Sequence, residues 1–354
     1  MFFSLLSPTT DSFWRYIKTW SPSLWTEDFE THISEPSYDN SSRFEDEFTI
    51  NRAIAADIPA IQQFLFTYFG NPPNTPILDI PEQTLLADYK ACISTIFYIT
   101  KKADANKILA TIRIKDIGRL LLQADKTSDI IQVIDCFCVH PAYKKKGLGR
   151  TLLQFLHNYT NKNNKPHVLF LKEGPSLSIF IPKLISNYYA YYAAPQNSPY
   201  ISTSFSPERI TELEYSVAYE YLKDYKSLNP NAFILVPDPT ASTSNIKWYL
   251  YREKSVQYIA CFQNTYQKMP GNMCEIGMCT GFFQIRGDPQ MFHRDAWRYF
   301  VDKSGYKYIW TNAEWVKDFA GTLLKGWEYD GPFHYYSFQW FTKFATNGYY
   351  CLNT

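Results

Sequence analysis

One segment in the middle of the chain constrains the fold more than any other. An apolar strand is expected over Ile130–Val139 and a helix from about Leu148 to Tyr159, and the loop between them reads HPAYKKKGLGR. Gly147 and Gly149 permit a tight loop whose backbone N–H groups point inward, and the first turn of the helix adds N–H groups that have no partner within the helix. A strand, loop and helix of this kind bind anions such as a pyrophosphate.

Cationic side chains of the loop strengthen this prediction, and coenzyme A carries a pyrophosphate, so we expect acyl-CoA as a co-substrate. The expected binding residues are Val139, Lys144, Lys145, Lys146, Gly147, Leu148, Gly149 and Arg150. The simpler alternative is a basic turn that only caps an ordinary helix. CoA is favoured because Val139, Pro141, Tyr143, Lys144, Gly147 and Gly149 resemble, in register, the signature of GNAT acyltransferases. Lys144 stands where that signature usually has Gln or Arg.

Composition and charge exclude several classes of function. The 354 residues are 45% apolar with a net charge of +1, which favours a large folded core and no general attraction to nucleic acid. Basic and aromatic residues do not cluster as in a nucleic-acid site. No run of 18 apolar residues occurs, so no transmembrane helix is expected.

The cysteines and histidines of the sequence indicate neither a disulfide framework nor a metal site. The seven cysteines are odd in number and form no CxxC pair, which indicates free thiols in a reducing compartment, so we expect a cytoplasmic protein. The histidines lack HxxxH or HxH spacing, so no metal site is expected and they are interpreted as structural.

The expected elements divide the chain in two. Residues 1–45 are interpreted as an extended arm anchored by Trp14, Trp20 and Trp25, residues 46–200 as one domain and residues 201–354 as a second. The first domain is expected to contain strands at 47–52, 95–100, 108–114, 130–139 and 167–172, and helices at 57–68, 82–93, 148–159 and 181–189. This order is similar to that of the GNAT fold, an α+β domain around a mixed sheet.

The second half shows a similar alternation of expected strands and helices. Strands are expected at 232–236, 246–251, 257–264, 274–285, 307–310 and 333–341, and helices at 288–303 and 318–325. The predicted fold class is therefore α+β, with two tandem GNAT-like domains built on mixed, mostly antiparallel sheets with flanking helices.

The strand before the loop is predicted to take part in catalysis. In the GNAT fold this strand splays from its neighbour, so the backbone amides of Cys136 and Phe137 are candidates to bind the thioester oxygen as it becomes an oxyanion. The side chains of Cys136 and Cys138 are interpreted as small buried groups. An acyl-carrying cysteine is the alternative, although no histidine is placed by the sequence to activate it.

Several separate segments resemble the N-myristoyltransferase family, whose tandem GNAT-like domains attach myristate to an N-terminal glycine. The family strand E-I-N-F-L-C-V-H corresponds to VIDCFCVH at 133–140, and its T-A-G turn to KEG at 172–174. Its F-N-A-L segment corresponds to WTNA at 310–313. Its D-G-N-L-Q-Y-Y-L-Y-N-W segment corresponds to DGPFHYYSFQW at 330–340, and fourteen residues follow here against about fifteen in the family.

The resemblance implies a set of roles. The free C-terminal carboxylate, here that of Thr354, would be the catalytic base, and the N-terminal peptide of a protein would be the acceptor. Asp135 and Lys172 replace an Asn and a Thr that help to position the amine in the family. Asp330 and Gly331 would contact the peptide backbone, or form an ordinary turn. The family loop R-S-K-R-V-A lacks the Gly-x-Gly found here.

The sequence is compatible with three functions. Transfer of myristoyl from myristoyl-CoA follows from the family resemblance. Transfer of acetyl from acetyl-CoA, with an accessory C-terminal domain, is favoured by the GLG loop and Lys144. A catalytically inactive structural protein that keeps the fold is the third, because Asp135 and Lys172 depart from the family.

Overall fold

The computed structural model describes most of the chain from residue 46 onward. The described residues are 30–31, 46–70, 75–163, 167–173, 183–193, 209–230, 232–237, 245–253, 256–287, 297, 299–317, 320–324, 326–338, 340–341 and 350–351. The Trp anchors predicted for the N-terminal arm and the C-terminal Thr354 lie outside them. None of the described helices is both long and apolar enough to cross a membrane.

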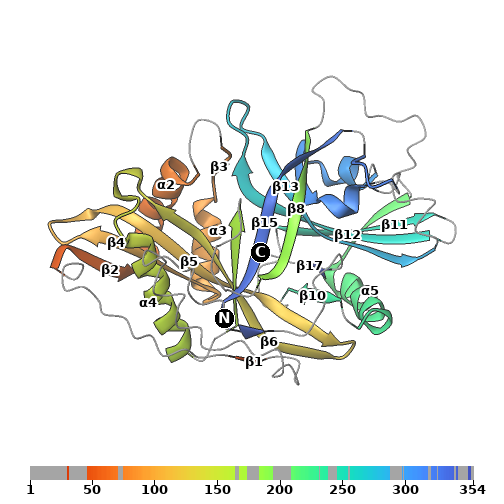
Figure 1. The fold of residues 1–354 in the computed structure, drawn as a ribbon, viewed down its shortest axis with the longest axis horizontal. Helices are drawn as coiled ribbons and strands as arrows, with labels where there is room; N and C mark the ends of the chain where they lie inside the picture. The colour runs from red at the N-terminus through yellow and green to blue at the C-terminus, as the bar shows by residue number, and fades with distance from the viewer. Residues whose placement is uncertain are drawn as a thin grey trace, which may run out of the picture.

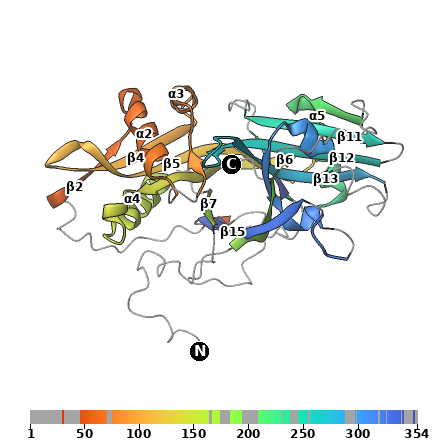
Figure 2. The same ribbon diagram turned by 90° about the horizontal axis from the view of Figure 1, so that it is seen from above.

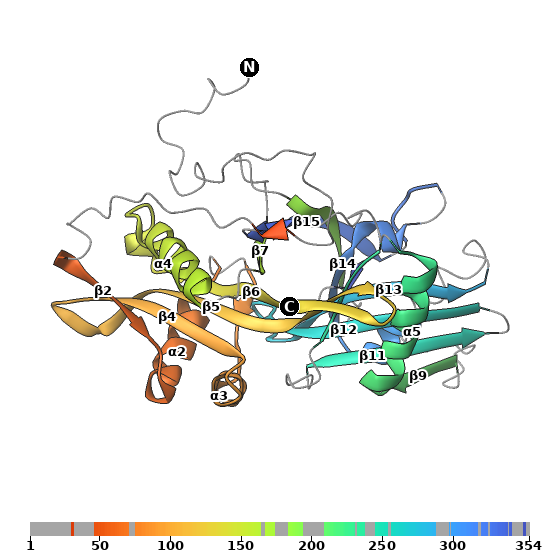
Figure 3. The same cartoon turned by 90° about the horizontal axis from the view of Figure 1, so that it is seen from below.

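The first half of the chain builds a sheet covered on both faces (Figure 1). Its elements are β2 (Phe48–Arg52), α2 (Ile58–Tyr68), β3 (Ile77–Leu78), α3 (Glu82–Lys90), β4 (Ser94–Lys101), β5 (Asp104–Gln123), β6 (Lys126–Val139), α4 (Leu148–Lys162) and β7 (Val168–Glu173). The strands pair in the order β2, β4, β5, β6, β7. Figure 3 shows α4 on one face of this sheet and α2 and α3 on the other.

Side-chain spacing explains which face each helix buries. Leu148, Leu152 and Leu156 recur every four residues on α4, are almost fully buried, and pack against Ile134 of β6. On the opposite face, Ile61 of α2 packs in a cluster that also holds Cys136 and Cys138 of β6. Each face therefore has its own apolar core.

Within its described residues, the second half contains one long helix and many strands. Its elements are β8 (Lys183–Ala193), β9 (Ile210–Leu213), α5 (Tyr215–Leu228), β10 (Phe233–Val236), β11 (Ile246–Glu253), β12 (Val256–Lys268), β13 (Glu275–Arg286), β14 (Tyr308–Asn312), β15 (Trp327–Phe338), β16 (Trp340–Phe341) and β17 (Tyr350–Cys351). Residues 299–304 are helical, in agreement with the predicted helix at 288–303 where the structure describes it.

The two halves share one sheet. Among the described residues, 15 strands join in the path β17-β10-β5-β6-β7-β15-β8-β14-β13-β12-β11-β9, with β2, β3 and β4 attached to it. In Figure 2 β7 and β15 lie between the two halves, and Figure 3 shows β5 and β6 reaching from one half to the other. The largest apolar cluster accordingly mixes Leu120 and Ile131 with second-half residues such as Phe262 and Trp297.

Two predicted helices are wrong. The segment predicted as a helix over 181–189 is strand β8, paired on one side with β14 and on the other with β15. Its tyrosines favour a strand, and these long-range backbone partners outweigh local helix propensity. In the second segment, predicted as a helix over 318–325, Lys317 and Leu323 form an antiparallel bridge. Gly321 has φ +79, which a helix does not accommodate.

Three further features complete the comparison with the predicted elements. Helix α5 and strand β9 were not predicted, because they follow a polar, breaker-rich stretch. Strand β5 extends nine residues beyond the predicted end at Ile114, to Gln123. In the N-terminal arm, β1 (Glu30–Thr31) pairs with β16.

Candidate active site

Strands β6 and β7 separate in the middle of the sheet. They run parallel, and their last pair is Ile134–Phe170. Beyond this point β7 continues beside β15, and β6 continues beside β5. An opening therefore begins at Asp135, on the strand that was predicted, from its resemblance to the GNAT fold, to splay from its neighbour. The rings of Phe137 and Phe170 make an edge contact near this point, with centroids 6.5 Å apart.

A β-bulge lies on β6 at the edge of this opening. Asp135 pairs with Arg113 and Cys138 pairs with Thr111, so two residues, Cys136 and Phe137, stand opposite one residue of β5. Cys136 has φ +49, a conformation that non-glycine residues rarely adopt and that often marks functional sites. The bulge also interrupts the alternation of side chains along the strand.

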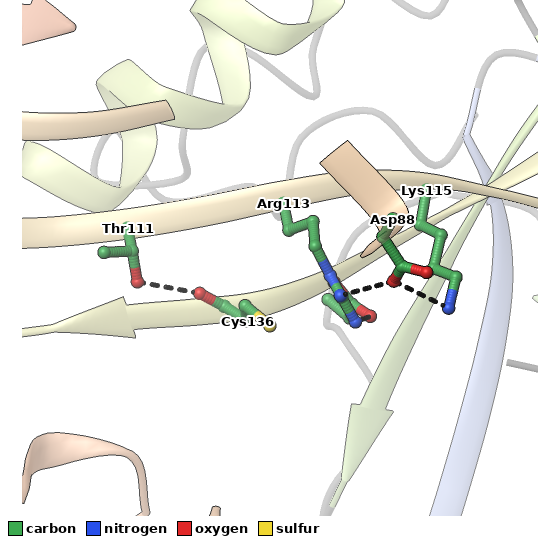
Figure 4. Close-up of polar contacts among 6 residues, drawn as sticks. Asp88, Thr111, Arg113, Lys115 and Cys136 are labelled. Atoms are coloured by element: carbon green, nitrogen blue, oxygen red, sulfur yellow. Dashed lines mark hydrogen bonds and ion pairs between the residues drawn. The ribbon is translucent and has the colours of Figure 1, made fainter. Parts of the chain in front are cut away.

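One hydrogen bond fixes the orientation of the bulged peptide. The hydroxyl of Thr111 on β5 donates to the carbonyl oxygen of Cys136 at 2.9 Å (Figure 4). In a trans peptide the carbonyl and the following N–H point in opposite directions. The N–H of Phe137 therefore points away from β5, toward the opening between β6 and β7.

The thiols of the bulge strand are poor nucleophiles. Burial raises the pKa of Cys136 far above its usual range, and burial raises the pKa of Cys138 to about 12. Because the thiolate is the reactive form, this disfavours the alternative of an acyl-carrying cysteine. The backbone amides of Cys136 and Phe137 stay the predicted functional groups of this strand.

The basic loop continues from β6 into α4. A 3-10 turn at Pro141–Tyr143 leads into the lysines, Lys145 has φ +65 and Gly147 has φ +87. The first backbone hydrogen bond of the helix runs from the N–H of Thr151 to the carbonyl of Gly147 at 3.0 Å. The amides before Thr151 thus lie at the N-terminal end, where an anion is stabilised.

The loop is packed close to the bulge. A Cβ added at Gly149 would lie 3.0 Å from the ring of Phe137, so the missing side chain lets the helix start sit directly against this residue. Lys144, Lys145 and Lys146 are exposed, and Lys144 lies near enough to Cys138 to lower its pKa in part. Amides, glycines and lysines together fit the diphosphate of CoA.

A buried charge cluster lies beside the bulge, on the α3 side of the sheet (Figure 4). The guanidinium of Arg113 binds Asp135 through two nitrogens at 2.6 and 2.5 Å, and binds Asp88 of α3 at 3.2 Å. Lys115 adds an ion pair of 3.0 Å to Asp88. The cluster thus joins two carboxylates to two cations.

Burial in this cluster is uneven. The side chains of Arg113 and Asp88 are 6% and 2% exposed, whereas that of Asp135 is 31% exposed. Burial lowers the pKa of Arg113, but the neighbouring charges, chiefly Asp135, and the hydrogen bond to Asp135 together outweigh burial and raise the pKa above its usual value. Asp135 is therefore the one carboxylate of this cluster that reaches the surface of the site.

Three of the four residues in this cluster, Arg113, Lys115 and Asp88, were not predicted from the sequence. Each nevertheless lies in a recognisable sequence pattern. Arg113 and Lys115 alternate with apolar residues in TIRIK, on one face of a central strand. Asp88 lies three residues after the fully buried Leu85, on the apolar face of α3. Buried charges require partners, and these are partners for one another.

The remaining predicted site residues lie on neighbouring strands. Lys172 is part of β7 and pairs with His334 of β15, so it lies on the arm of the opening that faces the bulge. Asp330 and Gly331 do not form a turn before a strand: they lie inside β15, at a shift of register between Tyr329 and Gly331. Partial burial raises the pKa of Asp330, and a hydrogen bond from the side chain of Trp310 lowers it in part.

The predicted base, the carboxylate of Thr354, lies outside the described residues. The nearest described residues before it, Tyr350 and Cys351 in β17, pair in parallel with Phe233 and Ile234 of β10. Since β10 is joined to β5 and β5 to β6, the last described segment lies in the same sheet as the bulge.

Comparison with known proteins shows where this arrangement recurs. Residues 59–176 match the acetyltransferase (GNAT) family. No curated protein matches the chain. Similar solved structures include three of N-myristoyltransferase from Saccharomyces cerevisiae.

These three structures resemble nearly the whole chain. One with bound myristoyl-CoA has a TM-score of 0.62 at 12% identity and covers 95% of this chain and 94% of that one. A second, with myristoyl-CoA and inhibitors, has a TM-score of 0.55 at 12% identity, with 88% and 84% covered. A third, with myristoyl-CoA, has a TM-score of 0.59 at 11% identity, with 96% and 90% covered. The predicted α+β fold of two tandem GNAT-like parts is confirmed.

Proposed function

We propose that this chain is an N-acyltransferase that moves a myristoyl group from myristoyl-CoA to the N-terminal glycine of proteins. The observation that carries the proposal is the extent of the fold likeness, which covers 95% of the chain. A single GNAT domain accounts for residues 59–176 only. The likeness to N-myristoyltransferase extends over both halves of this chain, which share one sheet.

The loop from Lys144 to Arg150 would hold the diphosphate of CoA. Its lysines supply charge, Gly147 supplies the left-handed backbone, and the start of α4 supplies amides. Val139 ends β6 just before the loop and packs with the α4 core. The pantetheine arm would then enter the opening between β6 and β7, which brings the thioester to the bulge.

The bulge would stabilise the charge that develops on the thioester oxygen. The N–H of Phe137 points into the opening because Thr111 holds the preceding carbonyl on the other side. Preorganised amide donors aimed at a developing oxyanion are among the strongest catalytic devices of acyl transfer. The amide of Cys136, next to it in the bulge, is the second donor in the proposal.

The acceptor amine would meet Asp135. A terminal ammonium has a pKa of about 8 and must lose a proton before it attacks. The carboxylate of Asp135 is partly exposed and held by Arg113, so it would bind and orient the ammonium group. The carboxylate of Thr354 is proposed as the base that takes the proton.

The transfer step then balances without another reactant. The amine nitrogen forms a bond to the thioester carbon, the C–S bond breaks, and the CoA thiolate leaves. The ammonium nitrogen gives up two protons in all, one before the attack and one after the new N–C bond forms. One of them protonates the thiolate, and the base passes the other to solvent. Lys172, on the arm opposite the bulge, is proposed to lie beside the departing group or the peptide.

A second candidate is acetyl transfer from acetyl-CoA. The specific observation in its favour is the GLG loop, which resembles simpler GNAT enzymes more than the R-S-K-R-V-A loop of the N-myristoyltransferase family. Asp330 and Gly331, in β15, would in either case contact the acceptor peptide.

The binding of acyl-CoA separates the two candidates. We expect myristoyl-CoA to raise the melting temperature of the protein more than acetyl-CoA does, because fourteen carbons bury more apolar surface. Native mass spectrometry on the same samples would report the stoichiometry. Equal shifts for both would favour acetyl transfer, and binding of neither would favour an inactive protein that keeps the fold.

A further inference from the structure

A polar pocket opens in the second half, at one end of strands β11 to β14. Its volume is about 550 Å³. Its lining includes Lys247, Asn264, Tyr266, Glu275, Tyr306 and Lys307. They come from β11, β12, β13 and the segment that leads into β14. No role follows for them from the acyl-CoA loop or the bulge.

The two tyrosines of the pocket are held by unusual backbone features. A Cβ on Gly277 would lie 2.3 Å from the ring of Tyr306, so this ring rests directly on the backbone of β13. Tyr266 has φ +54 within an irregular part of β12. Its N–H donates to the side-chain oxygen of Asn264 at 2.8 Å, which stabilises the turned backbone.

Tyr266 joins the pocket to the candidate active site. It packs in the same apolar cluster as Cys136 and Cys138, on the α3 face of the sheet. Burial raises the pKa of its hydroxyl, which also feels the charges of Asp88 and Arg113 on one side and Glu275 on the other. The pocket therefore lies next to the face of the sheet on which Asp135 reaches the surface.

Backbone pairing, a hydrogen bond and an ion pair connect the two halves at this point. Strand β3 pairs with β12 at Leu78–Gln267, and the N–H of Asp79 donates to the carbonyl of Tyr266 at 2.7 Å. An ion pair of 2.6 Å links Lys268 to Asp79. The distance from the amine site to the pocket is thus set by the fold.

Positive charge is in excess in the pocket. Lys247 and Lys307 are exposed, and neither forms an ion pair within the described part of the chain. The single carboxylate, Glu275, lies beside the two tyrosines and, after burial, helps to raise the pKa of Tyr306 to about 12. Two lysines that form no ion pair with any described residue, beside amide and phenol groups, favour an anionic guest.

We propose that this pocket binds a carboxylate side chain of the acceptor peptide, downstream of the amine that is acylated, through Lys247 and Lys307. The inference rests on the proposed function, because it takes the acceptor to be a peptide. It adds that the peptide carries an acidic residue at one fixed distance from its N-terminus.

The test uses a set of glycine-initiated octapeptides, labelled at the C-terminus, in which one glutamate is moved from the second to the eighth residue. Each is matched by a peptide with glutamine at that place. Fluorescence anisotropy on the full chain, with and without myristoyl-CoA, gives the Kd independently of turnover. We expect one register at which glutamate binds about tenfold more tightly than glutamine, the effect of one charge-assisted hydrogen bond.

Variants connect this preference to the pocket. Lys247→Gln combined with Lys307→Gln should abolish the preference, and Lys247→Glu with Lys307→Glu should transfer it to a lysine peptide. Lys223→Gln is the matched control, because it removes a lysine charge from α5, where Lys223 pairs with Glu220. It should leave the preference unchanged.

The outcomes separate the two proposals. Equal affinities at every register, a preference that persists in the double variants, or no peptide binding at all would overturn the pocket assignment, whatever acyl-CoA does. Failure to bind myristoyl-CoA, with the glutamate preference intact, would instead overturn the proposed function and leave an acidic-peptide site standing.

Discussion

Thr111 and Cys136 lie on the neighbouring strands β5 and β6, and the hydroxyl of Thr111 donates a hydrogen bond of 2.9 Å to the carbonyl oxygen of Cys136. Both residues are buried, at 0% and 3% exposure, so water does not replace this bond. The bond holds the bulged peptide with its other edge, the N–H of Phe137, toward the opening. It is thus the contact on which the proposed oxyanion site depends most.

Replacing this hydroxyl should lower the rate of transfer. Thr111→Val keeps the volume and removes the donor, so we expect kcat to fall roughly 10- to 100-fold, less than or equal to the loss of a direct oxyanion donor. The Kd for acyl-CoA should not change. The control is Thr100→Val, whose buried hydroxyl accepts from Asn51 at 3.1 Å on another strand. Full activity in Thr111→Val would contradict the role given to this bond.

Two glycines with the same backbone constraint should differ in their effect on CoA. Gly147 in the loop has φ +87 and Gly271 has φ +98, and a Cβ at either would meet nothing within 4 Å. Alanine at each should cost about 1 kcal/mol of stability, because of strain alone. Only Gly147→Ala should also weaken CoA binding, measured by titration calorimetry. A similar Kd for both variants would exclude the loop as the diphosphate site.

The cluster around Arg113 should show strong coupling. In a double-mutant cycle with Arg113→Gln and Asp135→Asn, we expect a coupling free energy of about 1–3 kcal/mol from urea unfolding, because the pair is bidentate and largely buried. The exposed pair Lys317–Glu314, at 2.6 Å, is the comparison and should give below about 0.5 kcal/mol. Equal coupling in both cycles would contradict a structural role for the Arg113 cluster.

Stability should fall at alkaline pH. The folded protein raises the pKa of Cys136 and Cys138 by burial, so these thiols keep their protons while the unfolded chain ionises above about pH 8.5. The folded state then binds more protons, and the free energy of unfolding decreases by up to about 1.4 kcal/mol per thiol and pH unit. Below the unfolded pKa these thiols contribute no pH dependence.

Urea unfolding between pH 7.5 and 9.5 measures this slope. Cys138→Ala should make it shallower, whereas Cys92→Ala should not, because Cys92 is exposed. Identical slopes in the two variants would show that the thiol of Cys138 ionises freely in the folded protein.

Local signals in the sequence predicted the part of the site that local structure builds. The strand, loop and helix around Gly147 follow from composition and spacing, and the structure has β6, the loop and α4 there. The parting of β6 from β7 also followed from the resemblance of this segment to GNAT enzymes. The roles of the individual residues remain predictions.

What the sequence did not predict depends on contacts between distant segments. Strand β8 was mistaken for a helix because its partners, β14 and β15, come more than a hundred residues later. The partnership of Asp88 with Arg113 joins a helix to a strand, and the pocket at Tyr266 joins β11, β12, β13 and the segment before β14. Such tertiary partners override local propensity, and no periodicity in the chain records them.

Mass spectrometry of a glycine-initiated peptide after incubation with this protein and myristoyl-CoA tests the proposed reaction most directly. The predicted result is one myristoyl group on the N-terminal amine, with no product from the same peptide when that amine is already acetylated. Transfer from acetyl-CoA but not from myristoyl-CoA, or no transfer from either while both bind, would contradict it.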